Sequence, residues 1–185
     1  MVSDIILGVV ADTHIPDRAS RLSENLLQAL DAQTVEYILH AGDISNRRII
    51  DQLSEIAPVY AVQGNRDWFY KLKLPTHIDL TFNGVKLTLT HGHGNIPYYI
   101  YDKMQYLLLG YTLTRYQRNL AKHHPAAQVI VFGHTHNQVN VQVNGQRFFN
   151  PGAAYPCEFN DSKPQYGILH ISPRGEITGK LLSSN

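Results

Sequence analysis

The first third of the chain alternates short apolar runs with segments of helical spacing, and this alternation constrains the fold most. Ile5–Val10 is a continuous apolar run, as expected for a strand covered on both faces. Further apolar runs at 37–40 and 59–62 predict two more strands. Between the strands, leucines from Leu22 to Leu30 follow helical spacing, and Asn46 predicts the cap of a second helix. This order predicts right-handed crossovers and a largely parallel sheet with helices outside it.

The sequence after Pro75 predicts a second, mixed or antiparallel sheet. Asn83-Gly84 and Asn144-Gly145 each separate two apolar runs, which is a hairpin signal, and a turn at 173–175 precedes a closing strand at 177–181. The intervening segment 96–124 is expected to form one long helix or two. It carries six of the 11 tyrosines, namely Tyr98, Tyr99, Tyr101, Tyr106, Tyr111 and Tyr116. Core packing, a wall or lid of a cleft, and an oligomer interface are its three candidate roles.

Polar residues that bind metals follow the apolar strands at five places. Asp, Asn and His side chains together suit Mn, Fe, Ni, Zn or Co, and the absence of thiolate ligands argues against a structural zinc or iron–sulfur site. Seven ligands are too many for one ion and suit two ions that share a bridging carboxylate. An extended backbone would let the alternate side chains of the Asp-x-His and His-x-His pairs point the same way. The predicted ligands are Asp12, His14, Asp43, Asn65, His91, His134 and His136.

The order of these motifs resembles the calcineurin-like metallophosphoesterases. Asp-x-His, Gly-Asp, Gly-Asn, a lone His and Gly-His-x-His follow in the family's sequence, and Asn150-Pro151-Gly152 looks most like the small YfcE-type phosphodiesterases. The resemblance implies an α/β fold, a four-layer α/β/β/α sandwich of two mixed sheets, in a single domain over 1–185.

The resemblance also implies the roles of the ligands. One metal would be bound by Asp12, His14 and His136, the other by Asn65, His91 and His134, with Asp43 as the bridge. Two divalent metal ions are expected as cofactors, manganese first, with Ni, Fe, Zn, Co or Mg as alternatives. In the family a hydroxide between the metals attacks the phosphate ester, so an enzyme of phosphodiester hydrolysis is expected.

Arg66 stands where larger family members carry a histidine after Gly-Asn. Arginine stays charged and cannot act as a general acid, but it can bind a phosphate oxygen, which favours diesters with good leaving groups. The alternative for Arg66 is an exposed ion pair with Asp67. The predicted catalytic residues are Asp43, Asn65, Arg66 and, as a substrate contact, His93. Alternative functions are a phosphomonoesterase or nucleotide hydrolase on the same site, and a non-catalytic protein-binding scaffold like the retromer subunit of this fold.

Charge and composition narrow the partners. Lys plus Arg (16) nearly balance Asp plus Glu (15), and the net charge of +1 argues against extended nucleic acid and against an anionic membrane surface. The substrate is expected to be a small phosphate ester. Cys157 is the only cysteine, and neither a signal peptide nor a spanning helix is evident, so we expect a cytoplasmic protein. The surplus of tyrosines predicts a homo-oligomer, a dimer or a tetramer.

Overall fold

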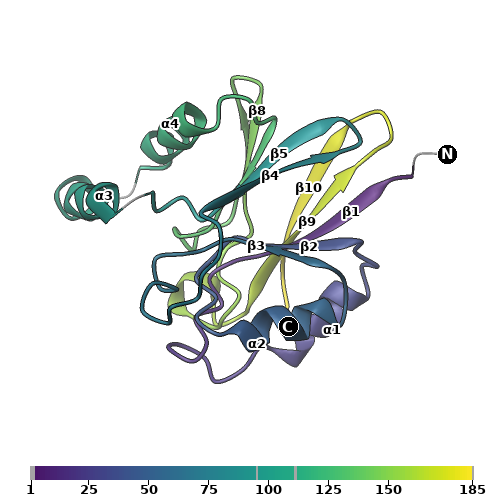
Figure 1. Cartoon of the computed structure of the whole chain (residues 1–185), viewed down its shortest axis with the longest axis horizontal. Helices are drawn as coiled ribbons and strands as arrows, with labels where there is room; N and C mark the ends of the chain where they lie inside the picture. The colour runs from purple at the N-terminus through teal and green to yellow at the C-terminus, as the bar shows by residue number, and fades with distance from the viewer. Residues whose placement is uncertain (1–2, 95, 111, 185) are drawn as a thin grey trace.

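A computed structural model describes residues 3–94, 96–110 and 112–184. Two five-stranded sheets pack face to face, with helices outside each of them (Figure 1). The expected four-layer sandwich of two mixed sheets is therefore confirmed. No helix among the described residues has the length and apolar character needed to cross a membrane.

The first sheet has the order β10-β9-β1-β2-β3. Its parallel strands are β1 (Ile5–Val10), β2 (Tyr37–His40) and β3 (Val59–Ala61), and the predicted crossover order is confirmed for them. The closing strand predicted at 177–181 was expected in the second sheet, and this was wrong. It forms β10 (Ile177–Ser183) and pairs with β9 (Gln165–Ile171), which pairs antiparallel with β1. A glycine explains how β9 fits against the second sheet: a Cβ on Gly167 would lie 2.4 Å from the ring of Phe149.

The second sheet has the order β4-β5-β6-β8-β7 and is mixed, as predicted. Both predicted hairpins form with positive φ at their two central residues, the backbone of a type I′ turn: 48° and 79° at Asn83-Gly84, 51° and 82° at Asn144-Gly145. The strands are β4 (His77–Phe82), β5 (Val85–Thr90), β6 (Val129–Val131), β7 (Val139–Val143) and β8 (Gln146–Asn150).

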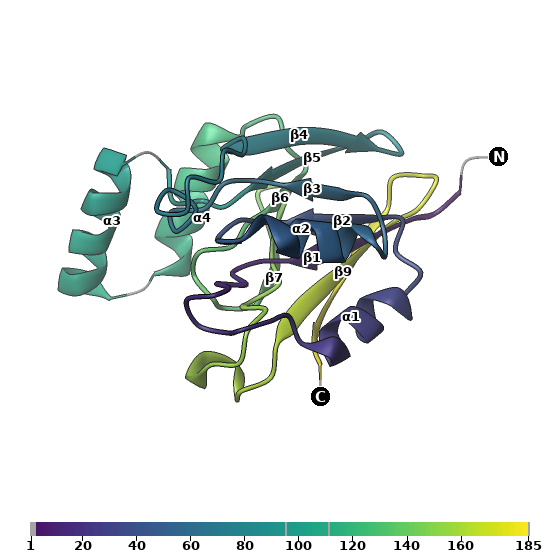
Figure 2. The same ribbon diagram turned by 60° about the horizontal axis from the view of Figure 1, so that its bottom comes forward.

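Helices α1 (Glu24–Asp31) and α2 (Arg47–Ser54) cover the outer face of the first sheet (Figure 2). Asn46 caps α2 as predicted, accepting a hydrogen bond from the backbone N–H of Arg48 at 3.0 Å. Leu22 lies just before α1, so the helical spacing overstated the length of that helix. Three buried apolar clusters fill the three spaces between the four layers. The short helix η1 (Glu158–Asn160) precedes β9.

The Tyr-rich segment forms two helices, α3 (Ile96–Leu109) and α4 (Leu113–His123). Helix α4 packs on the second sheet through Tyr116 and Leu120, whereas both views show α3 standing at the edge of the molecule beyond α4 (Figures 1 and 2). Tyr111 and the side chains of Tyr98 and Tyr106 lie outside the described residues. Five large apolar side chains of α3 are 54% to 81% exposed: Ile100, Tyr101, Met104, Leu107 and Leu108.

Candidate metal centre

The loops that carry the predicted ligands are joined by backbone hydrogen bonds. The N–H of Asp12 donates to the carbonyl of Gly42 at 3.0 Å, and the N–H of His14 donates to the carbonyl of Asp43 at 3.0 Å. In the second sheet, the N–H of Gly133 donates to the carbonyl of His91 at 3.3 Å. The ends of β1 and β2, and of β5 and β6, are therefore fixed relative to each other.

The backbone is left-handed at five predicted ligands, with φ between 49° and 68°. The extended backbone that would let the alternate side chains of the Asp-x-His and His-x-His pairs point the same way is not found. Residues other than glycine rarely adopt such angles, and where they do the surrounding structure enforces them, often at functional sites. The five residues are Asp12, His14, Asp43, His134 and His136.

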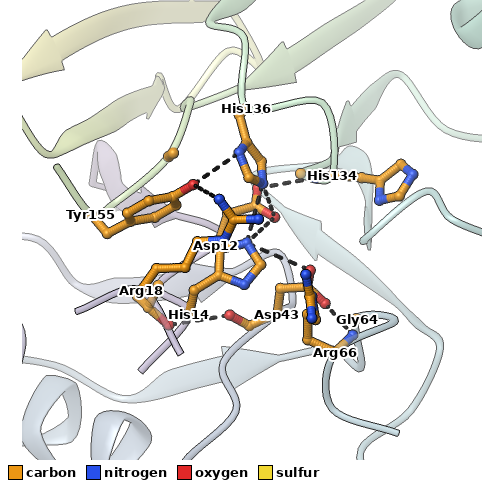
Figure 3. A network of polar contacts seen from close by, with 12 residues as sticks. Asp12, His14, Arg18, Asp43, Gly64, Arg66, His134, His136 and Tyr155 are labelled. Atoms are coloured by element: carbon orange, nitrogen blue, oxygen red, sulfur yellow. Dashed lines mark hydrogen bonds and ion pairs between the residues drawn. The ribbon is translucent and has the colours of Figure 1, made fainter. Parts of the chain in front are cut away.

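A first group of ligand atoms comes from Asp12, His14 and His136 (Figure 3). The Nε2 atoms of the two histidines are 3.1 Å apart, and Oδ1 of Asp12 lies 3.4 Å from Nε2 of His136 and 3.8 Å from Nε2 of His14. The hydroxyl of Tyr155 lies 3.4 Å from Nδ1 of His136, on the side of the ring away from this group. These three atoms face one another as ligands of a single cation would.

A second group consists of Asp12, Asp43 and His91. Nε2 of His91 lies 3.5 Å from Oδ1 of Asp43 and 3.2 Å from Oδ1 of Asn65. The other oxygen of Asp43, Oδ2, lies 3.7 Å from Nε2 of His14. The Asp43 carboxylate thus has one oxygen toward each group.

His134 joins neither group. Its backbone N–H donates to Oδ2 of Asp12 at 3.0 Å, but its ring points away from Asp12 and His136 (Figure 3). The ring lies beside His91, with the ring centroids 5.1 Å apart, and it stacks on Tyr116. His134 is therefore next to the second group, without a ring nitrogen at ligand distance in this arrangement.

The chemistry of these donor atoms fits a divalent cation. Oδ1 of Asp12 is buried and has no hydrogen-bond partner among the described residues, although three imidazole nitrogens face it at 3.4 to 4.0 Å. Nδ1 of His91 lies 2.7 Å from the carbonyl of Ala41, which would accept its N–H. Nε2 of His91 would then be a lone pair facing the oxygens of Asn65 and Asp43, an arrangement that a cation stabilises.

The pKa values reflect the same excess of negative charge. Burial alone would lower the pKa of His91, but the carboxylates of Asp43 and Asp12 outweigh it and raise that pKa to about 9. Burial would raise the pKa of Asp43, but His91 and His14 hold it below its usual value. Without a metal, the cluster attracts a proton to His91 instead.

Two buried polar side chains hold the ligand loops, and the sequence did not reveal either role. Asp67 is fully buried, and its carboxylate accepts hydrogen bonds from the N–H groups of Ile44, Ser45 and Gly64 at 2.6 to 2.9 Å. The surface ion pair considered for Asp67 is therefore wrong. Asn150 donates to the carbonyl of Gly133 at 2.8 Å, which ties the end of β8 to the loop that carries His134.

The glycines before the ligands serve two different purposes. Gly42 has a φ of 89°, as expected for a sharp turn. Gly64 and Gly133 are needed for close packing instead. A Cβ on Gly64 would lie 2.2 Å from the backbone nitrogen of Asp43, and one on Gly133 would lie 2.8 Å from the carbonyl oxygen of Ala41.

A cavity of about 250 Å³ opens over the ligand groups. Its described lining includes the predicted residues Asp43, Asn65 and Arg66, and also Arg18, which the sequence gave no reason to select. Arg18 donates to the hydroxyl of Tyr155 at 3.3 Å (Figure 3). The backbone N–H of Arg66 donates to Oδ1 of Asp43 at 2.7 Å, so the backbone of Arg66 lies directly beside the second group.

His93 does not line this cavity but a neighbouring one. Its ring packs between Trp68 and His91, with ring centroids 4.9 Å and 5.2 Å away. Burial lowers the pKa of His93 to about 3, so the ring is neutral. Its predicted contact with substrate stays a prediction.

The comparison with protein families decides the class of this site. The calcineurin-like phosphoesterase superfamily domain matches residues 5–174. The chain belongs to this superfamily. A probable metallophosphoesterase of Methanothermobacter thermautotrophicus is 34% identical over 167 residues, which cover 90% of this chain and 86% of that protein. The predicted resemblance to the calcineurin-like metallophosphoesterases is confirmed, and membership in this family supports phosphoesterase activity and the binding of divalent metals.

Solved structures with the same fold include proteins of two kinds. Vacuolar Protein Sorting 29 from Cryptosporidium parvum superposes with a TM-score of 0.72 at 19% identity, covering 99% of this chain and all of that one. An archaeal phosphodiesterase superposes with a TM-score of 0.63 at 22% identity, covering 96% of this chain and all of that one. At these identities both show the fold alone.

Proposed function

We propose that this member of the calcineurin-like superfamily is a phosphodiesterase that works with two divalent metal ions. The observation that carries the proposal is the carboxylate of Asp43, which has one oxygen 3.7 Å from Nε2 of His14 and the other 3.5 Å from Nε2 of His91. A carboxylate between two groups of nitrogen and oxygen ligands suits a bridge between two cations.

Each of the two groups of ligands would hold one ion. Asp12, His14 and His136 would hold one, and His91 with Asn65 would hold the other, completed by a reorientation of the His134 ring. Two bound divalent cations would activate water and neutralise charge that develops on the phosphoryl oxygens. The chain itself fixes these ligands through Asp67 and Asn150, which hold the loops, and through Ala41, which orients His91.

Phosphodiesters are the proposed substrates because of Arg66. Arg66 lines the cavity together with Asn65. A guanidinium there can bind a phosphoryl oxygen, yet it cannot protonate a leaving group. His93 supplies no acid in its place, since it is buried outside the cavity and its pKa is about 3. Hydrolysis of a diester with a good leaving group needs the least proton transfer, so such substrates are favoured over alkyl monoesters.

Two other functions are the alternatives to a phosphodiesterase. A phosphomonoesterase or nucleotide hydrolase would use the same ligands and would prefer monoesters. A protein-binding scaffold is the alternative suggested by the fold shared with Vacuolar Protein Sorting 29 and by the exposed apolar side chains of α3. The buried, unsatisfied carboxylate oxygen of Asp12 supports a bound cation, which the enzyme requires and a scaffold does not.

The test compares an aryl phosphodiester with the matching monoester, using chelator-treated protein to which Mn, Ni, Zn or Mg is returned. We expect metal-restored turnover of the diester that exceeds turnover of the monoester and is lost in Asn65→Ala. Asn119→Ala on α4, which lies outside the cavity over the ligands, is the matched control and should keep full activity. A preference for the monoester would contradict diester specificity, and no turnover despite two bound ions per chain would favour the scaffold.

Three finer expectations belong to the same proposal. Manganese is the first metal to test, because carboxylate, amide and imidazole ligands without thiolate suit it. A homo-oligomer is supported by the exposed apolar side chains of α3. A cytoplasmic location is supported by the single cysteine, Cys157.

A further inference from the structure

Positive charge converges on the cavity although the whole chain is nearly neutral. Four cationic side chains line it, and Asp43 is the only carboxylate in its described lining. They come from four separate parts of the chain: the loop after β1, the loop after β3, α3 and α4. The four are Arg18, Arg66, Lys103 and Arg115.

These cations lie on different sides of the cavity. Arg18 is held beside His136 by Tyr155, whose hydroxyl it contacts at 3.3 Å. The backbone N–H of Arg66 lies next to Asp43. Lys103 is on α3, with its ammonium nitrogen 5.5 Å from the ring centroid of Tyr99, and that ring lies 5.9 Å from the ring of His134.

Lys103 and Arg115 therefore border the cavity on the side of His134, where α3 and α4 meet the ligand loops. Arg18 reaches His136 through Tyr155, and the backbone of Arg66 lies beside Asp43, so these two are assigned to the reacting phosphate. The two cations on the helices line the cavity away from that point and are assigned to another part of the substrate. A cavity of about 250 Å³ has the volume of about eight water molecules, which exceeds what one phosphate needs.

The balance of charge points the same way. Asp12 and Asp43 bring two negative charges to the cluster, which two divalent cations would more than compensate. A simple phosphodiester adds one negative charge, and four further cations around it leave the site strongly positive. Arginine and lysine at such a site are typical of phosphate recognition.

We propose that the substrate carries a second phosphate group besides the diester that is cleaved, and that Lys103 and Arg115 bind this second phosphate. The inference rests on the proposed phosphodiesterase function and narrows its substrate class to small, multiply phosphorylated diesters. Affinity for such a substrate falls with rising salt, because the second phosphate is held by charge.

The test uses two substrates with the same reacting group and the same leaving group. One is the p-nitrophenyl ester of thymidine 5′-monophosphate, and the other is the same ester with an additional 3′-phosphate. The metal-loaded protein is compared with the double variant Lys103→Gln/Arg115→Gln and with each single variant. Arg118→Gln is the matched control, since Arg118 is an exposed cation of the same helix, α4, that does not line the cavity.

We expect kcat/KM of the wild type to be at least about tenfold higher for the ester with the 3′-phosphate, a ratio that falls to about one in the double variant and persists in Arg118→Gln. Equal kcat/KM in the wild type, or a preference that survives the double substitution, would overturn the proposal.

A binding measurement separates this inference from the proposed function. By calorimetry, the metal-loaded wild type should bind thymidine 3′,5′-bisphosphate at least about tenfold more tightly than thymidine 5′-monophosphate, and the double variant should lose this difference. If neither ester is hydrolysed with any metal, the phosphodiesterase proposal fails, while the binding ratio still decides the second-phosphate site: a ratio near one overturns it.

Discussion

The ligand loops and helix α3 both depart from the usual pattern of burial: the loops bury charged side chains, and α3 exposes apolar ones. In the loops, the charged side chains of Asp12 and Asp43 are at most 2% exposed, whereas in α3 Leu107 and Leu108 are 81% and 78% exposed. Carboxylates are rarely fully buried unless paired, and clustered apolar side chains are rarely so exposed on a monomer. Each region thus indicates something that the chain alone does not supply: a cation for the loops and a covering surface for α3.

The largest expected effect comes from removing the charge of the Asp43 carboxylate, which contacts both ligand groups. We expect Asp43→Asn to lower kcat/KM on an aryl diester by about a thousandfold or more, because the amide keeps the shape but cannot bridge two cations. Metal content measured on the purified variant should fall below two ions per chain. Asp51→Asn, an exposed carboxylate on α2, is the control and should change neither quantity. Full activity of Asp43→Asn would remove Asp43 from the site.

The ligand loops were predictable because their signals are local. Each predicted ligand follows an apolar run, and the carboxyl ends of parallel strands meet at one edge of a sheet, so Asp12 and Asp43 could be expected to converge. His91 follows β5 of the second sheet, and only the family resemblance implied that it joins them. What could not be predicted depends on contacts across the chain. Asp67 reaches the backbone of Ile44 and Ser45 over more than 20 residues, and no local pattern marks it.

The sequence did not predict which sheet the closing strands join, or which of α3 and α4 packs on a sheet, for a related reason. β9 has hairpin signals like those of the second sheet, and only its pairing with β1 assigns it to the first. Leucine and tyrosine occur throughout 96–124, so composition did not distinguish the helix that packs on the sheet from the one that does not. Burial is a property of the assembled layers, and periodicity alone does not determine it.

Equal truncations in the two helices sharpen the contrast. Leu120 of α4 is 3% exposed against Phe132 and Phe148, and we expect Leu120→Ala to lower the free energy of unfolding by about 3 kcal/mol through a lost core contact and a residual cavity. Leu107→Ala in α3 is the matched truncation and should change it by less than about 0.5 kcal/mol. Denaturant unfolding followed by circular dichroism measures both, and similar losses that do not vary with protein concentration would mean that α3 is covered within the monomer.

Acid should lower the free energy of unfolding through His40, which lies beside the ligand loops. This histidine at the end of β2 is fully buried, and burial lowers its pKa to about 3. Below about pH 6.5 this imidazole takes up a proton in the unfolded chain but stays neutral in the folded chain. Protonation therefore favours the unfolded chain, and the free energy of unfolding, unaffected by His40 well above pH 6.5, decreases as the pH falls toward 3. Between pH 6.5 and 5 the loss is about 2 kcal/mol.

The measurement is the free energy of unfolding at pH 7 and pH 5 for the wild type, His40→Asn and His123→Asn. The His40 variant should lose about 2 kcal/mol less than the wild type over this range, since it has no buried imidazole to keep neutral. His123 is exposed on α4, and its replacement should leave the dependence unchanged. The same acid sensitivity in all three proteins would exclude His40 as its source.

The smallest expected effect on stability separates the two ways in which α3 can be covered. Leu107→Ser combined with Leu108→Ser should change the free energy of unfolding of the monomer by less than about 0.5 kcal/mol, because both side chains are already in solvent. If α3 pairs with a second copy, the double substitution converts a dimer or tetramer into a monomer in a solution mass measurement. The midpoint of wild-type unfolding would then depend on protein concentration, and that of the variant would not. A wild type that is monomeric at all concentrations would contradict the homo-oligomer and leave α3 available to another partner. In either case turnover of the aryl diester should be retained, because neither leucine lines the cavity over the ligand groups.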